Sequence, residues 1–416
     1  MPRRLELTVS RSGATDSTII AEAERIHGPT SPRECVFSPV VVWTERQEGK
    51  WMLQCWSQNT LQTIYVSESM LRNPSTAVVE GRIYAAVEVD DAGGSGCIVV
   101  ADSGEVCFRT AGRNPVLRTA AWGLVLLCEQ VGADRSGVDL FLHNLDGGPA
   151  ARTLKSDDLN IHADMAYDPG SDSLFVCWES TPVWGFDPYV GRHRDINVMR
   201  LGRDGTLEPT PGTTNGRLAL PRVAHLNRCD TNMPPVYSRV LAIDGNPAVA
   251  YRNYRFRAGR SFGWDVFLTR YDGRVWTGPL RVSEHPGPPD AGYTILQRRG
   301  ELLGFFPCCD NDPPASPTRN HRIEVQRIGI DDGYSPEAIP LCGRGFYQIP
   351  FAVPNAAPDP PSPQPTGGRT LVWADLHQHT AQSKCMACID GSLEDVLSFQ
   401  RDILGCRVLT AGEHFH

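Results

Sequence analysis

The stretch LVLLCE at residues 124–129 is a short apolar run that ends in an acidic residue. Five similar runs, which often end in an acid or an aromatic, occur elsewhere in the chain, and the six run starts are separated by steps of 43, 41, 50, 73 and 55 residues. The shorter steps match one blade of a β-propeller, about 40 to 50 residues, and the longer ones fit a blade with an inserted loop. The other five runs are VVVWTE (40–45), IYAAVE (83–88), LFVCWE (174–179), PAVAYR (247–252) and LLGFFP (302–307).

The segments around each run repeat as well. An alternating segment that often ends near Asp-Gly follows the run, as at 138–147, 196–205 and 265–273, and a short further strand comes next. Four short strands joined by turn residues make one blade. Innermost strands are covered on both faces, which we expect to account for apolar runs such as LVLLC. An Asn often precedes the run: Asn73, Asn114, Asn160 and Asn232.

Six runs predict a mainly β fold, a β-propeller of about six blades, with five or seven blades as alternatives. Helical patterning is nearly absent before residue 390, and 39 Gly and 33 Pro suit a fold with many turns. We expect the N-terminal segment LELTVS (5–10) to complete the last blade and close the ring. A sandwich of two sheets is the alternative, but it does not predict a unit that repeats about every 40 residues.

Two inserts interrupt the repeat, at 180–195 and 252–265. Each lies between the second and third strands of its blade, so both should emerge on one rim. Arginines and aromatic residues together suit a planar or anionic ligand. The simpler interpretation is that long loops need aromatic residues to pack and arginines to remain solvated. The residues concerned are Trp184, Phe186, Tyr189, Arg192, Arg194, Arg252, Tyr254, Arg255, Arg257, Arg260 and Trp264.

Composition limits the classes of partner. The 416 residues carry a formal net charge of −8, which argues against nucleic acid or an anionic membrane as the main partner. No apolar run approaches the roughly 20 residues that span a bilayer, and the N-terminus lacks the apolar core of a secretory signal. The 13 cysteines, several of them in strand-like runs (Cys97, Cys107, Cys128, Cys177), are then expected to be mostly reduced and buried in a cytoplasmic protein.

The clearest domain boundary is the segment at 354–369, which contains six Pro and two Gly. Because proline removes backbone donors and favours extended conformations, this segment predicts a linker. The expected organisation is therefore a propeller over 1–350, a proline-rich linker over 351–370 and a different unit over 371–416.

The last 46 residues predict a strand, a helix and a strand. LVWADLHQHT (371–380) is expected to be a buried strand that ends in polar residues, and CRVLTAGEH (406–414) is expected to be a second strand of the same kind. Between them, SLEDVLSFQRDIL (392–404) has the apolar face of a helix, with Ser392 as its N-terminal cap. A βαβ unit of this length places its two strands in parallel, so that both polar ends lie at the same edge of the sheet.

That edge has the composition of a metal site. His377 and His379 point to the same side of their strand, and Glu413 and His414 approach from the next one. Imidazole and carboxylate ligands suit a divalent Zn, Mn or Fe ion, and Asp375 is placed to orient a ligand imidazole. Cys385 and Cys388 also have ligand-like spacing, but with no second pair nearby we expect a peripheral role.

At these residues the chain resembles the opening of a PHP (polymerase and histidinol phosphatase) domain, through DLHQHT, DGSLEDVLSF and VLTAGEH. The resemblance implies a distorted barrel of seven βα units with a site of two or three metals that hydrolyses phosphoesters. It also implies that His377, His379 and His414 are metal ligands, with Glu413 where the family usually has Asp. Asp390 matches a position that helps the family's site.

A barrel of this kind needs about 200 residues, whereas the chain ends two residues after His414. The sequence therefore predicts a propeller followed by an incomplete PHP-like metallohydrolase domain, inactive as this chain alone, from a parent that acts on a small-molecule or phosphoester substrate. The alternative is a binding module in which the propeller's rim loops hold a protein or a glycan without catalysis. A propeller hydrolase with its own central site is a third hypothesis.

Overall fold

The computed structural model describes 29 β-strands and a few residues outside them. The ranges described are 3–11, 14–23, 25–30, 40–57, 60–91, 94–131, 137–146, 151–155, 158–181, 195–220, 223–225, 228–233, 236–257, 261–283, 293–298, 301–309, 321–328, 374–378, 397, 400–401, 406 and 408–411.

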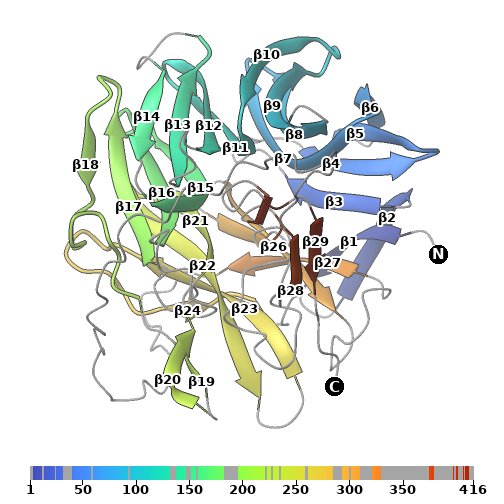
Figure 1. Cartoon of the computed structure of the whole chain (residues 1–416). Helices are drawn as coiled ribbons and strands as arrows, with labels where there is room; N and C mark the ends of the chain where they lie inside the picture. The colour runs from blue at the N-terminus through green and yellow to red at the C-terminus, as the bar shows by residue number, and fades with distance from the viewer. Residues whose placement is uncertain are drawn as a thin grey trace, which may run out of the picture.

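Six blades surround a common axis, as a β-propeller requires, and blades 3 and 4 belong to one continuous sheet (Figure 1). In chain order, blade 1 consists of β3 (Arg25–Thr30), β4 (Val40–Gln47), β5 (Lys50–Ser57) and β6 (Thr60–Ser67). Blade 2 consists of β7 (Met70–Val79), β8 (Arg82–Asp91), β9 (Gly94–Ala101) and β10 (Val106–Ala111). Blade 3 consists of β11 (Arg113–Ala120), β12 (Gly123–Val131), β13 (Val138–Asn144) and β14 (Arg152–Lys155).

Blades 4 to 6 complete the circle. Blade 4 consists of β15 (Leu159–Asp168), β16 (Ser173–Thr181), β17 (Asp195–Gly202) and β18 (Leu207–Pro209). Blade 5 consists of β21 (Val236–Ile243), β22 (Asn246–Arg257), β23 (Ser261–Arg270) and β24 (Leu280–Arg281). Blade 6 consists of β25 (Thr294–Arg298), β26 (Glu301–Cys309), β27 (His321–Ile328), β1 (Arg3–Arg11) and β2 (Ala14–Ala23). A hairpin of β19 (Val223–His225) and β20 (Arg228–Met233) lies between blades 4 and 5 in the chain. Blades 3 and 4 share one bridging pair, Val138 with Leu159.

Each of the six apolar runs forms the second strand of a blade, which confirms the propeller and its repeat. The expectation that runs such as LVLLC are innermost strands is wrong. The first strands β7, β11, β15 and β21 contact one another around the axis. The second strands are apolar on both faces because a neighbouring blade covers each face, and Leu124 to Glu129 are all buried.

The hydrophobic core is a set of layers between blades. Ala86 and Val99 of blade 2 pack with Leu126 of blade 3, and Cys177 of blade 4 packs with Tyr251 of blade 5. These side chains are fully buried. Because every layer needs two blades, each blade depends on its neighbours for burial.

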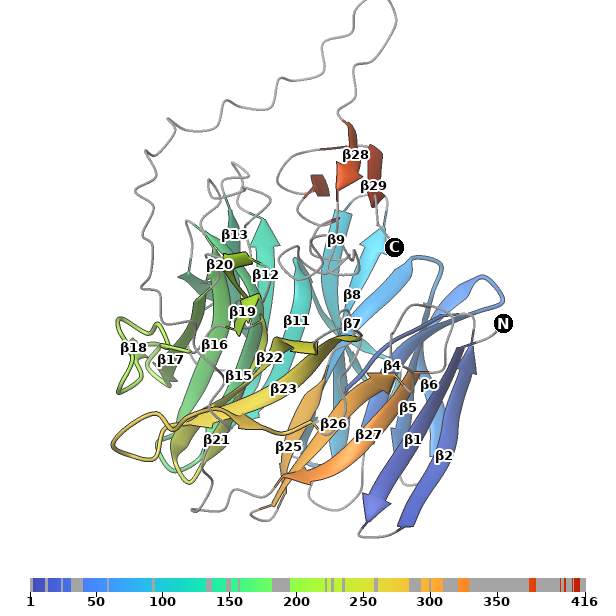
Figure 2. The ribbon, with the colours of Figure 1, turned by 90° about the horizontal axis from the view of Figure 1, so that it is seen from below.

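The N-terminal strand closes the ring, as the sequence predicts. β1 pairs in parallel with β27, with Glu6 opposite Arg322 and Val9 opposite Val325. β2 then covers the outer edge of β1. Blade 6 therefore contains strands from both ends of the propeller (Figure 2).

Beyond the propeller, β28 (Ala374–Gln378) and β29 (Val408–Ala411) pair in parallel, as predicted. Leu397, Gln400 and Arg401, between them in sequence, are helical. This C-terminal unit lies over one end of the propeller axis, which Figure 1 shows from above and Figure 2 from the side. The domain limits at 350 and 370 stay a prediction, because they fall outside the described residues. In the part of the chain that is described, no helix has the length and apolar character to cross a membrane.

Ring closure can be tested through one backbone donor. Leu7 lies opposite Ile323 of β27 and Thr18 of β2, so Leu7→Pro disrupts the pairing that joins β1 to blade 6. We expect a lower melting temperature and more aggregation, since the edge of β27 is then exposed. Leu7→Val keeps the N–H and is the control. Equal melting curves for both variants would show that closure does not depend on β1.

Candidate functional site

The first strands of blades 2 to 5 share a β-bulge near the axis. The register shifts by one residue after Arg72, Arg113, Ile161 and Val236. The next residue in each strand has a left-handed backbone, with φ of 50° at Asn73, 47° at Asn114, 53° at His162 and 56° at Tyr237. Asn tolerates this conformation, whereas it strains a bulky residue such as Tyr. The bulge must therefore be held in place by its surroundings.

Buried glutamates at the ends of the second strands hold the bulges. Glu88, Glu129 and Glu179 have no exposed surface, and each accepts a hydrogen bond from a backbone N–H in the bulge of the next blade. Each is also bonded to the left-handed residue of its own blade. The inter-blade bonds are Asn114 N to Glu88 Oε2 (3.1 Å), His162 N to Glu129 Oε1 (2.7 Å) and Ser238 N to Glu179 Oε1 (3.0 Å).

Cationic side chains partner the same glutamates. Arg72 Nη2 lies 2.6 Å from Glu88 and Arg113 Nε lies 3.1 Å from Glu129, with all four side chains at least nine-tenths buried. Burial raises the pKa of Glu129, while Arg113 and His162 act in the opposite direction. Both oxygens of Glu129 have hydrogen-bond donors, which satisfies a buried charge that would otherwise be costly.

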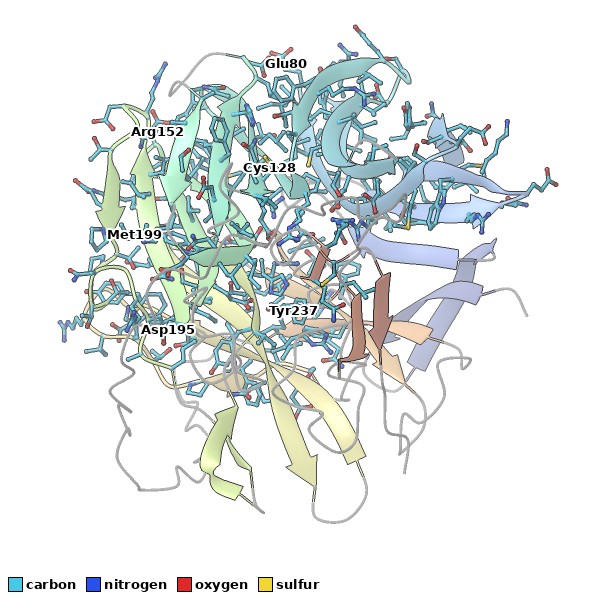
Figure 3. The ribbon with its side chains drawn as sticks, in the orientation of Figure 1. Glu80, Cys128, Arg152, Asp195, Met199 and Tyr237 are labelled. Atoms are coloured by element: carbon cyan, nitrogen blue, oxygen red, sulfur yellow. The ribbon has the colours of Figure 1, made fainter. Side chains whose placement is uncertain are left out.

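Blade 5 departs from this pattern. Arg252 is almost fully buried and stands at the end of the apolar run of its second strand, where the runs of blades 1 to 4 have Glu. Its guanidinium lies 5.7 Å from the ring centre of Tyr237, which stacks on the His162 ring at 4.4 Å. Tyr237 is half-buried and lies near the centre of the ring of blades, whereas Arg152 lies at the periphery (Figure 3). The aromatic and cationic groups of blades 4 and 5 thus meet near the axis.

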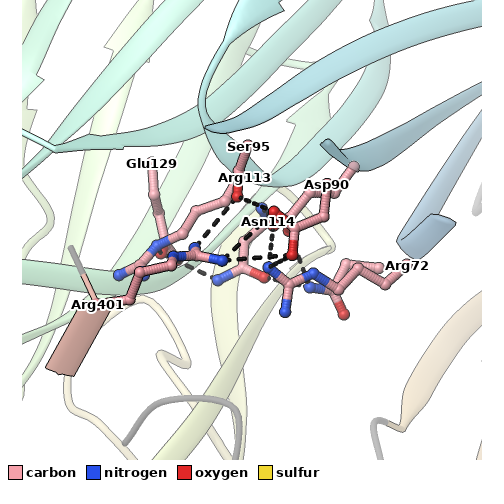
Figure 4. Close-up of polar contacts among 9 residues, drawn as sticks. Arg72, Asp90, Ser95, Arg113, Asn114, Glu129 and Arg401 are labelled. Carbon is pink, nitrogen blue, oxygen red and sulfur yellow. Dashed lines mark hydrogen bonds and ion pairs between the residues drawn. The ribbon is translucent and has the colours of Figure 1, made fainter. Parts of the chain in front are cut away.

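These groups form one cluster, here named the axial polar cluster. It contains Arg72, Asn73, Glu88, Asp90, Arg113, Asn114, Glu129, His162, Glu179, Tyr237 and Arg252. The helical segment of the C-terminal unit contacts it. Arg401 Nη1 lies 3.3 Å from Asp90, and Nη2 donates to Ser95 Oγ at 3.1 Å (Figure 4). A guanidinium from outside the propeller is therefore bound at this end of the axis.

The predicted metal site is only partly described. The backbone of β28 includes Asp375 and His377, and the pairing of Gln378 with Ala411 brings the ends of both strands together, as expected. His379, Asp390, Glu413, His414, Cys385 and Cys388 lie outside the described residues, as do the side chains of Asp375 and His377. Within the described ranges, no group of three or more His, Cys, Asp or Glu is placed to hold a metal. The divalent-metal site stays a prediction.

The inserts and the cysteines are also partly described. The second insert continues β22 and β23 as a paired hairpin that ends at Arg257 and Ser261, and most of its side chains, like the first insert, lie outside the description. Cys97, Cys128 and Cys177 are buried and are not in disulfides, as expected, but Cys107 is exposed on the outermost strand of blade 2.

Comparison with known proteins finds no family model that matches the chain and no curated protein that matches it. Solved structures with similarity include an endo-arabinase from Bacteroides thetaiotaomicron, with a TM-score of 0.41 and 12% identity over 63% of this chain and 95% of that one. They also include an ulvan lyase of polysaccharide lyase family PL25, with a TM-score of 0.43 and 12% identity over 69% and 80% of the two chains. Trypanosoma rangeli sialidase matches with a TM-score of 0.41 and 11% identity over 74% and 56%.

The resemblance of residues 371–416 to the PHP family is wrong by these comparisons. No family model matches the chain, and this segment is part of it. The resemblance rested on a few polar residues at two strand ends, and a parallel pair with polar ends is common to many α/β folds. The expected phosphoester substrate and the PHP-like barrel are withdrawn with it.

Sequence reasoning missed the axial polar cluster, although the chain contains a signal for it. The tripeptide Arg-Asn-Pro occurs at 72–74 and again at 113–115, one blade apart, and four of the six runs end in Glu. Of the predicted upstream residues, Asn73 and Asn114 occupy the bulge, but His162 and not Asn160 does so in blade 4. Asn160 instead bonds the Val138 carbonyl at 3.0 Å.

The glutamate contacts predict a large stability effect. Glu129→Ala leaves Arg113 buried without its partner, so we expect a loss of about 3–5 kcal/mol in unfolding free energy, measured by urea denaturation. Glu208→Ala removes an even shorter ion pair, in which Glu208 lies 2.6 Å from Arg200 and both side chains are about half exposed. This control should lose less than about 1 kcal/mol. Similar losses for the two variants would contradict a structural role for the buried pair.

The Arg401 contact predicts how firmly the C-terminal unit is held. Arg401→Ala removes a partly exposed ion pair of about 1 kcal/mol, so we expect roughly fivefold faster release of this unit in limited proteolysis with thermolysin. Arg203→Ala, which removes a 3.8 Å exposed pair with Asp172 on blade 4, is the control. Unchanged cleavage in Arg401→Ala would mean that this contact does not anchor the unit.

Proposed function

We propose that this chain is a propeller binding module and that its ligand is a carbohydrate held at the axial polar cluster. The observation that carries the proposal is the binding of the Arg401 guanidinium by Asp90 and Ser95 at the end of the axis. A surface that accepts a polar group from another part of the chain by directed hydrogen bonds is suited to a polar ligand.

The chemistry of the cluster favours a sugar. Sugar hydroxyl groups both donate and accept, and partly exposed carboxylate and amide groups such as Asp90 and Asn114 complement them. A sugar ring also has an apolar face, which packs against an aromatic ring, and Tyr237 is the half-buried aromatic residue of the cluster. The net charge of −8 argues against a polyanionic ligand such as nucleic acid.

Binding fits the cluster better than hydrolysis does. A glycosidase needs carboxyl groups that are free to donate a proton and to activate water. Glu88, Glu129 and Glu179 instead have both oxygens engaged by donors of the protein and no exposed surface. We therefore assign these glutamates to holding the blades and the partly exposed residues to the ligand.

Tyr237→Asn separates the ligand role from the structural one. Asn occupies the same left-handed position in blades 2 and 3, so this variant relieves backbone strain that offsets the lost stacking on His162. We expect nearly unchanged thermal stability. For any oligosaccharide that the unaltered protein binds, the variant should bind at least tenfold more weakly, a loss of about 1.4 kcal/mol in binding free energy. The probes are an array of neutral pentose, neutral hexose and uronate-containing oligosaccharides, followed by calorimetry.

Tyr271→Asn is the matched control, because Tyr271 packs against Trp276 in the segment between β23 and β24 of blade 5. It should leave binding unchanged. If no oligosaccharide on the array binds, or if Tyr237→Asn binds as well as the unaltered chain, the carbohydrate proposal is wrong. If a peptide covering residues 392–406 binds to the protein while no oligosaccharide does, the result would instead favour a protein ligand.

A further inference from the structure

The contact that holds Arg401 consists of a small set of hydrogen-bond acceptors on blade 2. Asp90 of β8 and Ser95 of β9 lie directly opposite each other in this strand pair. Arg401 Nη1 lies 3.3 Å from both carboxylate oxygens of Asp90, and Nη2 donates to Ser95 Oγ at 3.1 Å (Figure 4). Asp90 and Ser95 are named here the acceptor pair.

The side chains of the acceptor pair only accept hydrogen bonds from the group that they hold. Ser95 Oγ donates its hydrogen to Asp90 Oδ1 at 3.0 Å, so this hydroxyl is an acceptor toward Arg401, and an ionised carboxylate has no hydrogen to donate. A group that fits the pair must therefore bring several donors. A guanidinium or an ammonium does so, whereas an acetamido group brings one N–H and a carboxylate brings none.

The charge balance of the axial polar cluster also favours a cation at the acceptor pair. With His162 neutral, its four carboxylates and three guanidiniums leave one negative charge, which Arg401 compensates. Arg72 lies 2.6 Å from Glu88 but 3.5 Å from Asp90, so its charge is shared between them and mostly serves Glu88. The charged members are Glu88, Asp90, Glu129, Glu179, Arg72, Arg113 and Arg252.

The Arg401 guanidinium can be exchanged for another cation. Its side chain is 35% exposed, and that of Asp90 is 19% exposed with Arg401 in place. The distance from Arg401 to Asp90, 3.3 Å, is longer than the 2.6 Å between the buried partners Arg72 and Glu88. Because ion pairs in contact with water contribute little, a ligand that brings its own cation can take the place of Arg401.

We propose that the acceptor pair is a subsite for a protonated amino group, that the carbohydrate ligand is an amino sugar, and that Arg401 is the internal group that this ligand replaces. The inference rests on the carbohydrate function proposed above and narrows it to one class of sugar. The ammonium of the sugar donates to Asp90 and Ser95 as the guanidinium does. An N-acetylated sugar lacks the charge, and Asp90 repels the carboxylate of a uronate.

Calorimetry with two matched oligosaccharides tests the subsite. Oligomers of glucosamine and of N-acetylglucosamine, equal in length and linkage, join the array and are titrated into the whole chain at about pH 6.5, where amines are largely protonated. We expect the glucosamine oligomer to bind about tenfold more tightly, since hydrogen bonds to a charged group are the stronger ones. Asp90→Asn keeps the shape of the side chain without its charge and should reduce this preference to less than about twofold.

Asp195→Asn is the matched control. The Asp195 carboxylate also lies 3.3 Å from an arginine, Arg217, and is 26% exposed, but it belongs to β17, the third strand of blade 4. This variant should keep the full preference for the glucosamine oligomer. Arg401→Ala removes the internal competitor, so the same oligomer should bind about fivefold more tightly. Melting temperatures check that the variants fold, and the comparison of the two oligomers in the unaltered chain needs no variant.

The outcomes separate this inference from the proposed function. If both oligomers bind equally well, if Asp90→Asn keeps the preference, or if Arg401→Ala leaves the affinity for glucosamine unchanged, the amino-sugar subsite is wrong while carbohydrate binding stands. If neither oligomer nor any other sugar on the array binds, the proposed function itself is wrong. A lysine oligomer that binds as tightly as the glucosamine oligomer would show that the acceptor pair recognises a cationic peptide, and it would overturn the inference as well.

Discussion

A hydrogen bond between a buried glutamate of one blade and a backbone N–H of the next is the contact on which the rest of this propeller depends. The second strands of blades 2, 3 and 4 each carry a glutamate near the axis, and its carboxylate accepts a hydrogen bond from the bulge of the following blade. The bulge leaves this N–H without a strand partner, and the left-handed residue directs it to the glutamate. Apolar layers hold the blades together along their length, and the glutamates fix their relative position at one end.

The same arrangement gives one end of the axis its chemistry. Buried glutamates need cations and amides as hydrogen-bond donors, and Arg72, Arg113 and Asn114 supply them at this end of the axis. The buried glutamates, whose oxygens all accept hydrogen bonds, stabilise the ring of blades. Partly exposed carboxylates such as Asp90 are available to a ligand or to Arg401. Structure and recognition thus use neighbouring residues of one cluster.

The fold could be predicted from the sequence further than the site. Six runs of similar length identified six second strands, and 5–10 was correctly expected to close the ring, because burial between blades imposes apolar runs at regular spacing. The site depends on bulges, whose left-handed residues are Asn in two blades but His162 and Tyr237 in others, so composition alone did not mark them. The two-histidine pattern at His377 and His379 drew attention to a family that the comparisons do not support, since few residues carried it.

The parallel pairing of β1 with β27 also has a consequence for how the chain folds during synthesis. Residues 6–9 are translated more than 300 positions before their partners, which lie at 322–325. Blades 1 to 5 have all their strands before that point, whereas blade 6 cannot form until nearly the whole propeller has been translated. Such a distant contact slows the final step and leaves the first strands unpaired for longest. The start of the chain is therefore the segment for which a chaperone that shields unpaired strands matters most.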